Sequence, residues 1–124
     1  MKKIIVLALS VACFAACKKS NSADTLPPVV SITSPSANQQ FGAGATINIT
    51  GTIYDNRELH SVHVIVVNKT TNAEVLHFEE HVDVQTYEVN KSFVAAAATV
   101  YVIHVEGEDH TGHHAQAELE VRAN

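Results

Sequence analysis

The sequence has 124 residues, of which 46% are hydrophobic and 17% are charged, so it predicts one globular domain and excludes a disordered chain. The formal net charge is -5 at pH 7, which argues against nucleic acid as a partner. The chain has 8 histidines, all between His60 and His114. Imidazoles that are mostly neutral at this pH are available as metal ligands.

Residues 1–16 predict a secretory signal peptide. Lys2 and Lys3 precede an apolar run from Ile4 to Ala16 that is too short for a stop-transfer helix. The run ends in FAAC, which resembles a bacterial lipoprotein signal, in which Cys17 is lipidated and becomes the first mature residue. Cys13 is a second candidate, but it leaves a shorter apolar run. These are the 2 cysteines of the chain, so the mature domain relies on its core without a disulfide.

Residues 17–27 predict the lipidated cysteine and a flexible tether, and residues 28–124 predict the folded domain. An acylated cysteine would hold the protein on a membrane. Lys18 follows the cysteine, whereas retention at the inner membrane usually goes with an acidic residue there. We therefore expect delivery to the outer membrane, and the sequence leaves open which leaflet carries the anchor.

From Pro28 onward the sequence shows strand patterns and no helical period. The turn sequences SPSANQQFGAG and DNRE, and the run AAAA at 95–98, which we read as a loop, interrupt segments of alternating apolar and polar residues. These segments are residues 29–33, 45–55, 59–68, 74–82, 86–93, 99–107 and 114–123. The pattern predicts an all-β fold, an Ig-like antiparallel β-sandwich of about seven strands.

The stretches PPVVSITSP, FGAGATINITGTIYDNREL and YVIHVEGED resemble bacterial Ig-like domains of cell-surface lipoproteins. Over roughly Pro27 to Asn124 the chain is similar to a domain-of-unknown-function family of Bacteroides-type lipoproteins. These are short chains with a lipobox, one Ig-like domain and a His-rich C-terminal half. The resemblance implies a fold and a location but no reaction. It also implies that Tyr101 lies near the start of the sixth strand, in a position like a tyrosine corner.

Threading the segments through an Ig-like strand order predicts that the histidines gather toward one end of the sandwich. Alternation along the strands puts four of them on the outer face of one sheet, where neighbouring strands lie about 4.8 Å apart. This predicted face cluster consists of His63 and His104 with His77 or His114, and of the nearby Glu79 and Glu106. A second, predicted loop cluster consists of His60, His110, His113, His114, Asp55 and Asp109. Imidazole together with carboxylate suits Zn²⁺, Cu²⁺ or Ni²⁺.

Other interpretations stay open. A histidine on the wet face of a sheet is most often ordinary polar surface. Asp55, Asn56 and Asp109 are turn formers that could instead bind Ca²⁺ through their oxygens, which we favour less than a transition metal. The sequence lacks G-x-S-x-G, H-E-x-x-H and a Gly-rich phosphate loop, so we expect no enzymatic activity.

We therefore predict an outer-membrane-anchored Ig-like lipoprotein that binds a transition metal through its histidines. The first alternative is a non-catalytic adhesion or accessory module that binds a protein or glycan partner at the cell envelope without metal. The second is a pH-responsive interface, in which clustered imidazoles protonate at about pH 6 and repel one another.

Overall fold

A computed structural model describes residues 22–124 of the chain. The predicted signal peptide, Cys17 and the first part of the predicted tether lie outside these residues. The elements are β1 (Val29–Ser34), β2 (Gln39–Phe41), β3 (Thr46–Asn68), β4 (Glu74–Val94), β5 (Thr99–Asp109) and β6 (His114–Ala123). Within the described range, no helix has the length and hydropathy needed to cross a bilayer.

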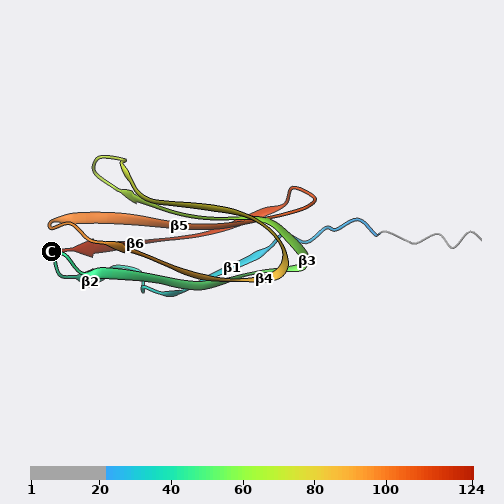
Figure 1. Cartoon of the computed structure of the whole chain (residues 1–124), viewed down its shortest axis with the longest axis horizontal. Coiled ribbons are helices and arrows are strands. Elements are labelled where there is room, and N and C mark those ends of the chain that lie inside the picture. Colours follow the sequence, from blue (N-terminus) through green and yellow to red (C-terminus); the bar gives the residue numbers. More distant parts are fainter. Residues whose placement is uncertain (1–21) are drawn as a thin grey trace, which may run out of the picture.

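The strands form two layers that enclose an apolar core (Figure 1). One layer contains β1, the first half of β3 and the second half of β4, and the other contains the second half of β3, the first half of β4, β5 and β6. The predicted all-β Ig-like sandwich is therefore confirmed.

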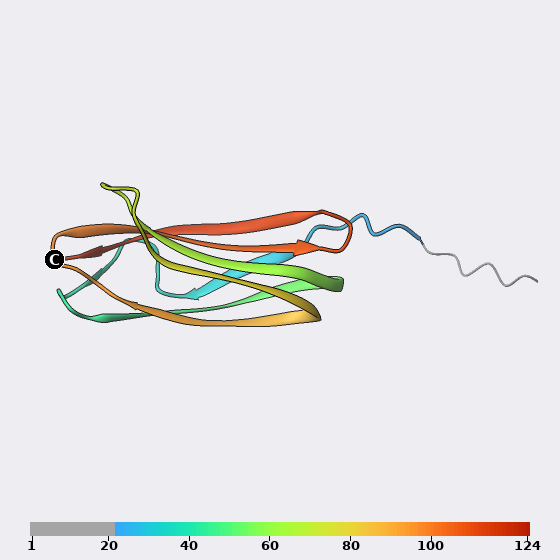
Figure 2. The ribbon, with the colours of Figure 1, turned by 45° about the horizontal axis from the view of Figure 1, so that its top comes forward.

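β3 and β4 form one long antiparallel ribbon that folds over at one end of the sandwich and so belongs to both layers (Figure 2). The ladder runs from the pair Thr46–Val94 to the pair Val67–Glu74, with register shifts between Tyr54 and Ser61. The sequence pattern predicted a break in each of these strands, at residues 55–58 and 83–85. The direction change at DNRE was predicted correctly, and residues 55–58 have no partner in the β3–β4 ladder. Both strands nevertheless run on through the bend, so four predicted strands are two elements.

β2 lies within the stretch SPSANQQFGAG, so the prediction that this whole stretch is a turn was wrong. Gln39, Gln40 and Phe41 pair in parallel with the last residues of β6. The chain thus leaves one layer after β1 and joins the edge of the other. Three residues are too few to show an alternating pattern, and the surrounding Gly, Ser and Pro hid this strand.

The core consists of the apolar residues that alternate along β3 and β5. Fully buried side chains from both layers meet there: Ile47, Ile49, Ile53, Val62, Val64, Val66, Ile103 and Val105. Phe93 packs edge-on against Tyr101, with ring centres 4.9 Å apart. The Tyr101 hydroxyl accepts a hydrogen bond from the Ala96 N–H at 2.8 Å, which is the contact expected of a tyrosine corner.

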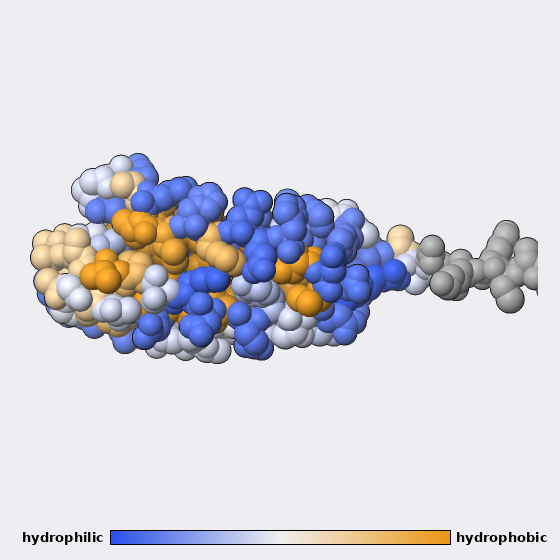
Figure 3. All heavy atoms as spheres, in the orientation of Figure 1, coloured by the Kyte–Doolittle hydropathy of each residue, from blue (hydrophilic) through white to orange (hydrophobic). Residues whose placement is uncertain are grey.

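Hydrophilic and apolar residues are unevenly spread over the surface. In Figure 3 the hydrophilic residues gather over the half of the molecule where the N-terminal segment meets the domain, and apolar colour extends toward the opposite end. The fold-over of the β3–β4 ribbon and the turn after β5 lie at this hydrophilic end, together with the N-terminal segment (Figure 1). The sandwich therefore brings three distant parts of the sequence to one place.

Candidate cation site

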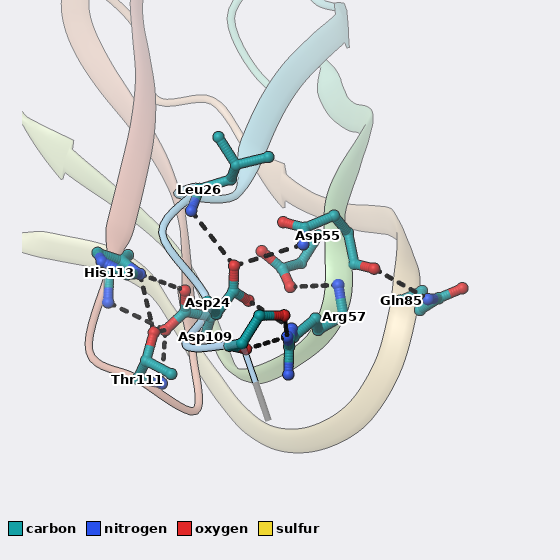
Figure 4. A network of polar contacts seen from close by, with 10 residues as sticks. Asp24, Leu26, Asp55, Arg57, Gln85, Asp109, Thr111 and His113 are labelled. Atoms are coloured by element: carbon teal, nitrogen blue, oxygen red, sulfur yellow. Dashed lines mark hydrogen bonds and ion pairs between the residues drawn. The ribbon is translucent and has the colours of Figure 1, made fainter. Parts of the chain in front are cut away.

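Three aspartates meet at this end of the sandwich (Figure 4). Asp55 lies in the fold-over of β3, Asp109 is the last residue of β5, and Asp24 lies in the N-terminal segment before β1. Each offers an oxygen atom that lies within 4.8 Å of the oxygens offered by the other two. We refer to Asp24, Asp55 and Asp109 as the aspartate cluster.

Asp55 shapes the bend through one oxygen and leaves the other without a partner. Its Oδ1 accepts the N–H of Arg57 at 2.8 Å, as an Asp does when it closes a turn on its own backbone. Its Oδ2 has no hydrogen-bond partner among the described residues, although Asp55 is only 1% exposed. A buried carboxylate oxygen without a donor or a cation is costly, so this atom points to a missing positive partner.

Asp109 organises the turn between β5 and β6. Its Oδ1 accepts the N–H and the hydroxyl of Thr111 at 2.6 and 2.8 Å and the N–H of His113 at 3.0 Å. Its Oδ2 lies 2.8 Å from Nδ1 of His113. Burial by itself raises the pKa of Asp109, but the hydrogen bonds from Thr111 and His113 outweigh it and lower the pKa to about 2. Asp109 is therefore ionised at every physiological pH.

Asp24 brings the N-terminal segment into the cluster. Its side chain is 3% exposed, and its Oδ1 accepts hydrogen bonds from the N–H of Leu26 at 3.2 Å and the amide of Asn56 at 3.4 Å. Nε of Arg57 lies 3.9 Å from Oδ2 of Asp24, and the same guanidinium donates to the carbonyl of Ser22. Ser22 and Asp24, which lie in the stretch predicted as a flexible tether, thus contact the fold-over of β3.

The aspartate cluster has the chemistry of a site for a hard divalent cation. Three carboxylates gather in one place. The side chain of Arg57, which is half exposed, lies beside them, with its Nε 3.9 Å from Oδ2 of Asp24. Ca²⁺ takes six to eight oxygen ligands at about 2.3–2.6 Å, and carboxylates that are mono- or bidentate supply several of them. The donors are all oxygens, which Ca²⁺ and Mg²⁺ prefer over the imidazoles and thiolates that suit transition metals.

Two members of the aspartate cluster were singled out from the sequence, and one was missed. Asp55 and Asp109 were candidates because they occupy turns that an Ig-like order places at the same end. Asp24 was missed because a polar segment after a lipobox reads as a tether. The only feature of the sequence that could have indicated Asp24 is its position a few residues before the two prolines that precede the first strand. This is a weak indication in a single sequence.

The predicted face cluster lies on the outer face of the sheet, but its members face carboxylates. His63 is opposite Glu79 of β4 and Glu106 of β5 in the two ladders. The neighbours of the other three are also acidic: His77 lies 2.9 Å from Glu74, His104 lies 3.0 Å from Glu118, and His114 lies 3.9 Å from Glu106. The strand register therefore places a glutamate directly opposite His63 and His104, whereas His77 and His114 find theirs along the strand and diagonally across it.

The predicted loop cluster is divided among three neighbourhoods. His113 is bonded to Asp109 and so belongs to the turn around the aspartate cluster. His60 and His110 contact each other, with ring centres 4.8 Å apart, and His60 also contacts His81 of β4. His114 begins β6 and points toward Glu106.

The fold and its strand connections define a module of the immunoglobulin-like class. The family model described as bacterial Ig domain matches residues 28–105, and the chain belongs to this family. A search of curated proteins found no match.

Among solved structures, the chain is similar to the fibronectin(III)-like modules of Clostridium thermocellum CbhA, with 21% identity and a TM-score of 0.51. The alignment covers 77% of this chain and 94% of that one. Murine CRIg aligns with 10% identity and a TM-score of 0.47, covering 78% of this chain and 98% of that one. The first of these likenesses supports the sandwich fold.

Proposed function

We propose that this chain is a non-catalytic Ig-like module of the cell envelope whose membrane-facing end binds Ca²⁺ through Asp24, Asp55 and Asp109. The observation that carries the proposal is the unpartnered, buried Oδ2 of Asp55 beside two further buried carboxylates. A divalent cation would offset the repulsion among them and supply the missing partner. Sites in extracellular modules bind Ca²⁺ with Kd values of about 10⁻⁴–10⁻³ M, which suits a protein outside the cytoplasm.

The proposed location rests on the predicted lipobox. A lipid on Cys17 would hold the module on the outer membrane, and the segment that ends at Asp24 would connect the lipid to the domain. An ion bound by Asp24 together with Asp55 and Asp109 would fasten this segment to the sandwich. The module would then leave the membrane at a defined angle instead of swinging on a free tether.

A partner at the envelope, a protein or a glycan, would meet the module at its other surfaces. The predicted transition-metal site on the outer face stays a prediction, and so does the pH-responsive interface. The pairing of His77, His104 and His114 with glutamates favours an ordinary polar surface for that face.

Thermal unfolding of the chelator-treated protein, with and without added Ca²⁺, tests the proposal. Ca²⁺ at 100 times its Kd should raise the free energy of unfolding by about 2.7 kcal/mol. Asp55→Asn should abolish this response and should make the chelated protein at least as stable as the wild type, because the amide can keep the turn contact of Oδ1 and replaces the buried Oδ2 that has no donor. Glu58→Gln, an exposed change in the same bend, is the matched control and should keep the response.

A wild-type melting temperature that does not respond to Ca²⁺ or Mg²⁺ would refute the cation site. The same conclusion follows if Asp55→Asn responds as the wild type does.

A further inference from the structure

A second group of potential ligand side chains lies beside the aspartate cluster, where the imidazoles of His81 and His110 flank that of His60. The ring centre of His60 is 5.0 Å from that of His81 and 4.8 Å from that of His110. The interplanar angles are 57° and 54°, so the rings do not stack face to face. His81 and His110 are exposed, and His60 is partly buried.

The two distances from His60 are compatible with imidazoles that share a metal ion, although the three side chains, as they lie, do not offer nitrogens that are all within 4.8 Å of one another. Zn²⁺ binds histidine nitrogens at about 2.0–2.1 Å, so the ring centres of two histidine ligands in a tetrahedral site lie about 5 Å apart. Both contacts of His60 have this separation. Because His81 is exposed, rotation of its side chain can turn a ring nitrogen toward an ion held by the other two rings.

The backbone directs His60 toward this group. Leu59 pairs with Asp109 and Ser61 pairs with Glu108, so His60 is an extra residue of β3 between two adjacent residues of β5. A β-bulge of this kind re-aims a side chain and is frequent beside functional sites. The same irregularity brings Ser61 opposite His81 of β4.

His110 is already held by a carboxylate. Its Nε2 lies 2.9 Å from Oδ1 of Asp83, whose side chain is 80% exposed, so Nδ1 is the ring nitrogen left for a metal. Metal-binding histidines commonly have such a carboxylate on the second ring nitrogen. Asp83 and His110 also line a hollow of about 580 Å³, together with Glu58, through which an ion can reach the group.

We propose that His60, His81 and His110 bind a transition metal such as Zn²⁺, and that Asp83 is a positioning residue for His110. Three imidazoles leave one tetrahedral position for water or for a donor from a partner. The histidine group shares no residue with the aspartate cluster. The two also differ in chemistry, because imidazole nitrogens suit Zn²⁺ and carboxylate oxygens suit Ca²⁺.

The test is calorimetric titration with Zn²⁺ of the full chain carrying C13S and C17S, so that no thiol competes for the metal. Saturating Ca²⁺ occupies the aspartate cluster throughout. The expected result is one Zn²⁺ per chain, with affinity lost in His60→Gln and in His81→Gln and reduced about tenfold in Asp83→Asn. His77→Gln, four residues from His81 on the same strand, should bind as the wild type does.

Co²⁺ absorption provides a readout of geometry, since tetrahedral Co²⁺ absorbs visible light far more strongly than octahedral Co²⁺. The wild type should show the strong bands, and His81→Gln, a change at an exposed position, should lose them without loss of folding. Absence of Zn²⁺ binding overturns the proposal. So does binding that is lost in His63→Gln and His104→Gln but kept in His60→Gln, because it would place the metal on the outer face.

The proposal and the Ca²⁺ site can fail separately. Asp55→Asn should abolish the response to Ca²⁺ and leave Zn²⁺ binding intact, whereas His81→Gln should do the reverse. Loss of Zn²⁺ binding in Asp55→Asn would show that one site accounts for both ions and would overturn the proposal of a second site.

Discussion

The carboxylates of Asp24 and Asp109 lie within 4.8 Å of each other, although one belongs to the segment before β1 and the other ends β5. Both side chains are almost completely buried. The contact therefore connects the N-terminal segment to the layer that contains β5, across the end of the sandwich. An ion at this position would join two parts of the chain that no strand pairing joins.

The first prediction is that Ca²⁺ orders the N-terminal segment. In hydrogen exchange, Ca²⁺ should slow exchange at the amides of residues 24–26, because the ion holds Asp24 against Asp55 and Asp109. Asp24→Asn should remove this effect while leaving the core amides protected. Thr25→Ala, an exposed neighbour, is the control and should exchange as the wild type does. Equal protection with and without Ca²⁺ in the wild type would count against a cation-held segment.

The second prediction concerns acid stability in the presence of chelator. The pKa of Asp109 is about 2 in the folded protein against 3.8 in a model compound, a difference equivalent to about 2 kcal/mol. Because the folded pKa is depressed, this stabilisation is present above pH 3.8 and is lost as the pH falls toward 2. The free energy of unfolding, followed by denaturant titration from pH 5 to pH 2, should fall more steeply in the wild type than in Asp109→Asn. Parallel curves would show that the hydrogen bonds of Asp109 do not stabilise the fold.

The third prediction is that replacing Gly51 by any larger residue lowers the free energy of unfolding. A Cβ atom at this position would lie 2.2 Å from the carbonyl oxygen of Ser31, so Gly51→Ala must push β1 away from β3. The expected loss is at least about 1–3 kcal/mol of unfolding free energy, measured by denaturant titration. Gly42→Ala is the matched control, since nothing lies within 4 Å of its added Cβ, and it should change stability by less than about 0.5 kcal/mol.

The fourth prediction isolates the hydroxyl of Tyr101. Tyr101→Phe keeps the buried ring against Phe93 and removes only the bond to the Ala96 N–H, so it should cost about 1 kcal/mol. Tyr54→Phe serves as the control, because Tyr54 is 46% exposed, and it should be nearly neutral. Equal stability of the two variants would mean that water replaces the Tyr101 hydroxyl at no cost.

The alternation of apolar and polar residues was enough to predict the layers of the sandwich. Val62, Val64 and Val66 were expected to share a face and are fully buried, as are Ile103 and Val105 of β5. The period of two along a strand is a local property, so a single sequence reveals it. Leu76 and Phe78 share the predicted inward face but are only partly buried.

The register between strands could not be predicted in the same way. Whether His63 faces another histidine or a glutamate depends on which residue of β4 and β5 lies opposite, and one residue of slip exchanges every neighbour. The bulge at His60 and the burial of Asp24 likewise depend on tertiary packing. The sequence therefore indicated the kinds of ligand at this end, whereas their grouping depended on the three-dimensional structure.

The continuous ladder of β3 and β4 has a consequence for how the chain reaches its native state. The turn at residues 69–73 joins β3 to β4. Pairing can start beside this turn and spread along the two strands, past the irregularity at the bend, to Thr46 and Val94. Each new pair closes only a small additional loop, so the entropy cost is met in small steps. Once the ladder is paired on both sides of the bend, strands of both layers are in register. Pairing that starts at this one hairpin turn can thus align both halves of the sandwich without help from β1 or β6.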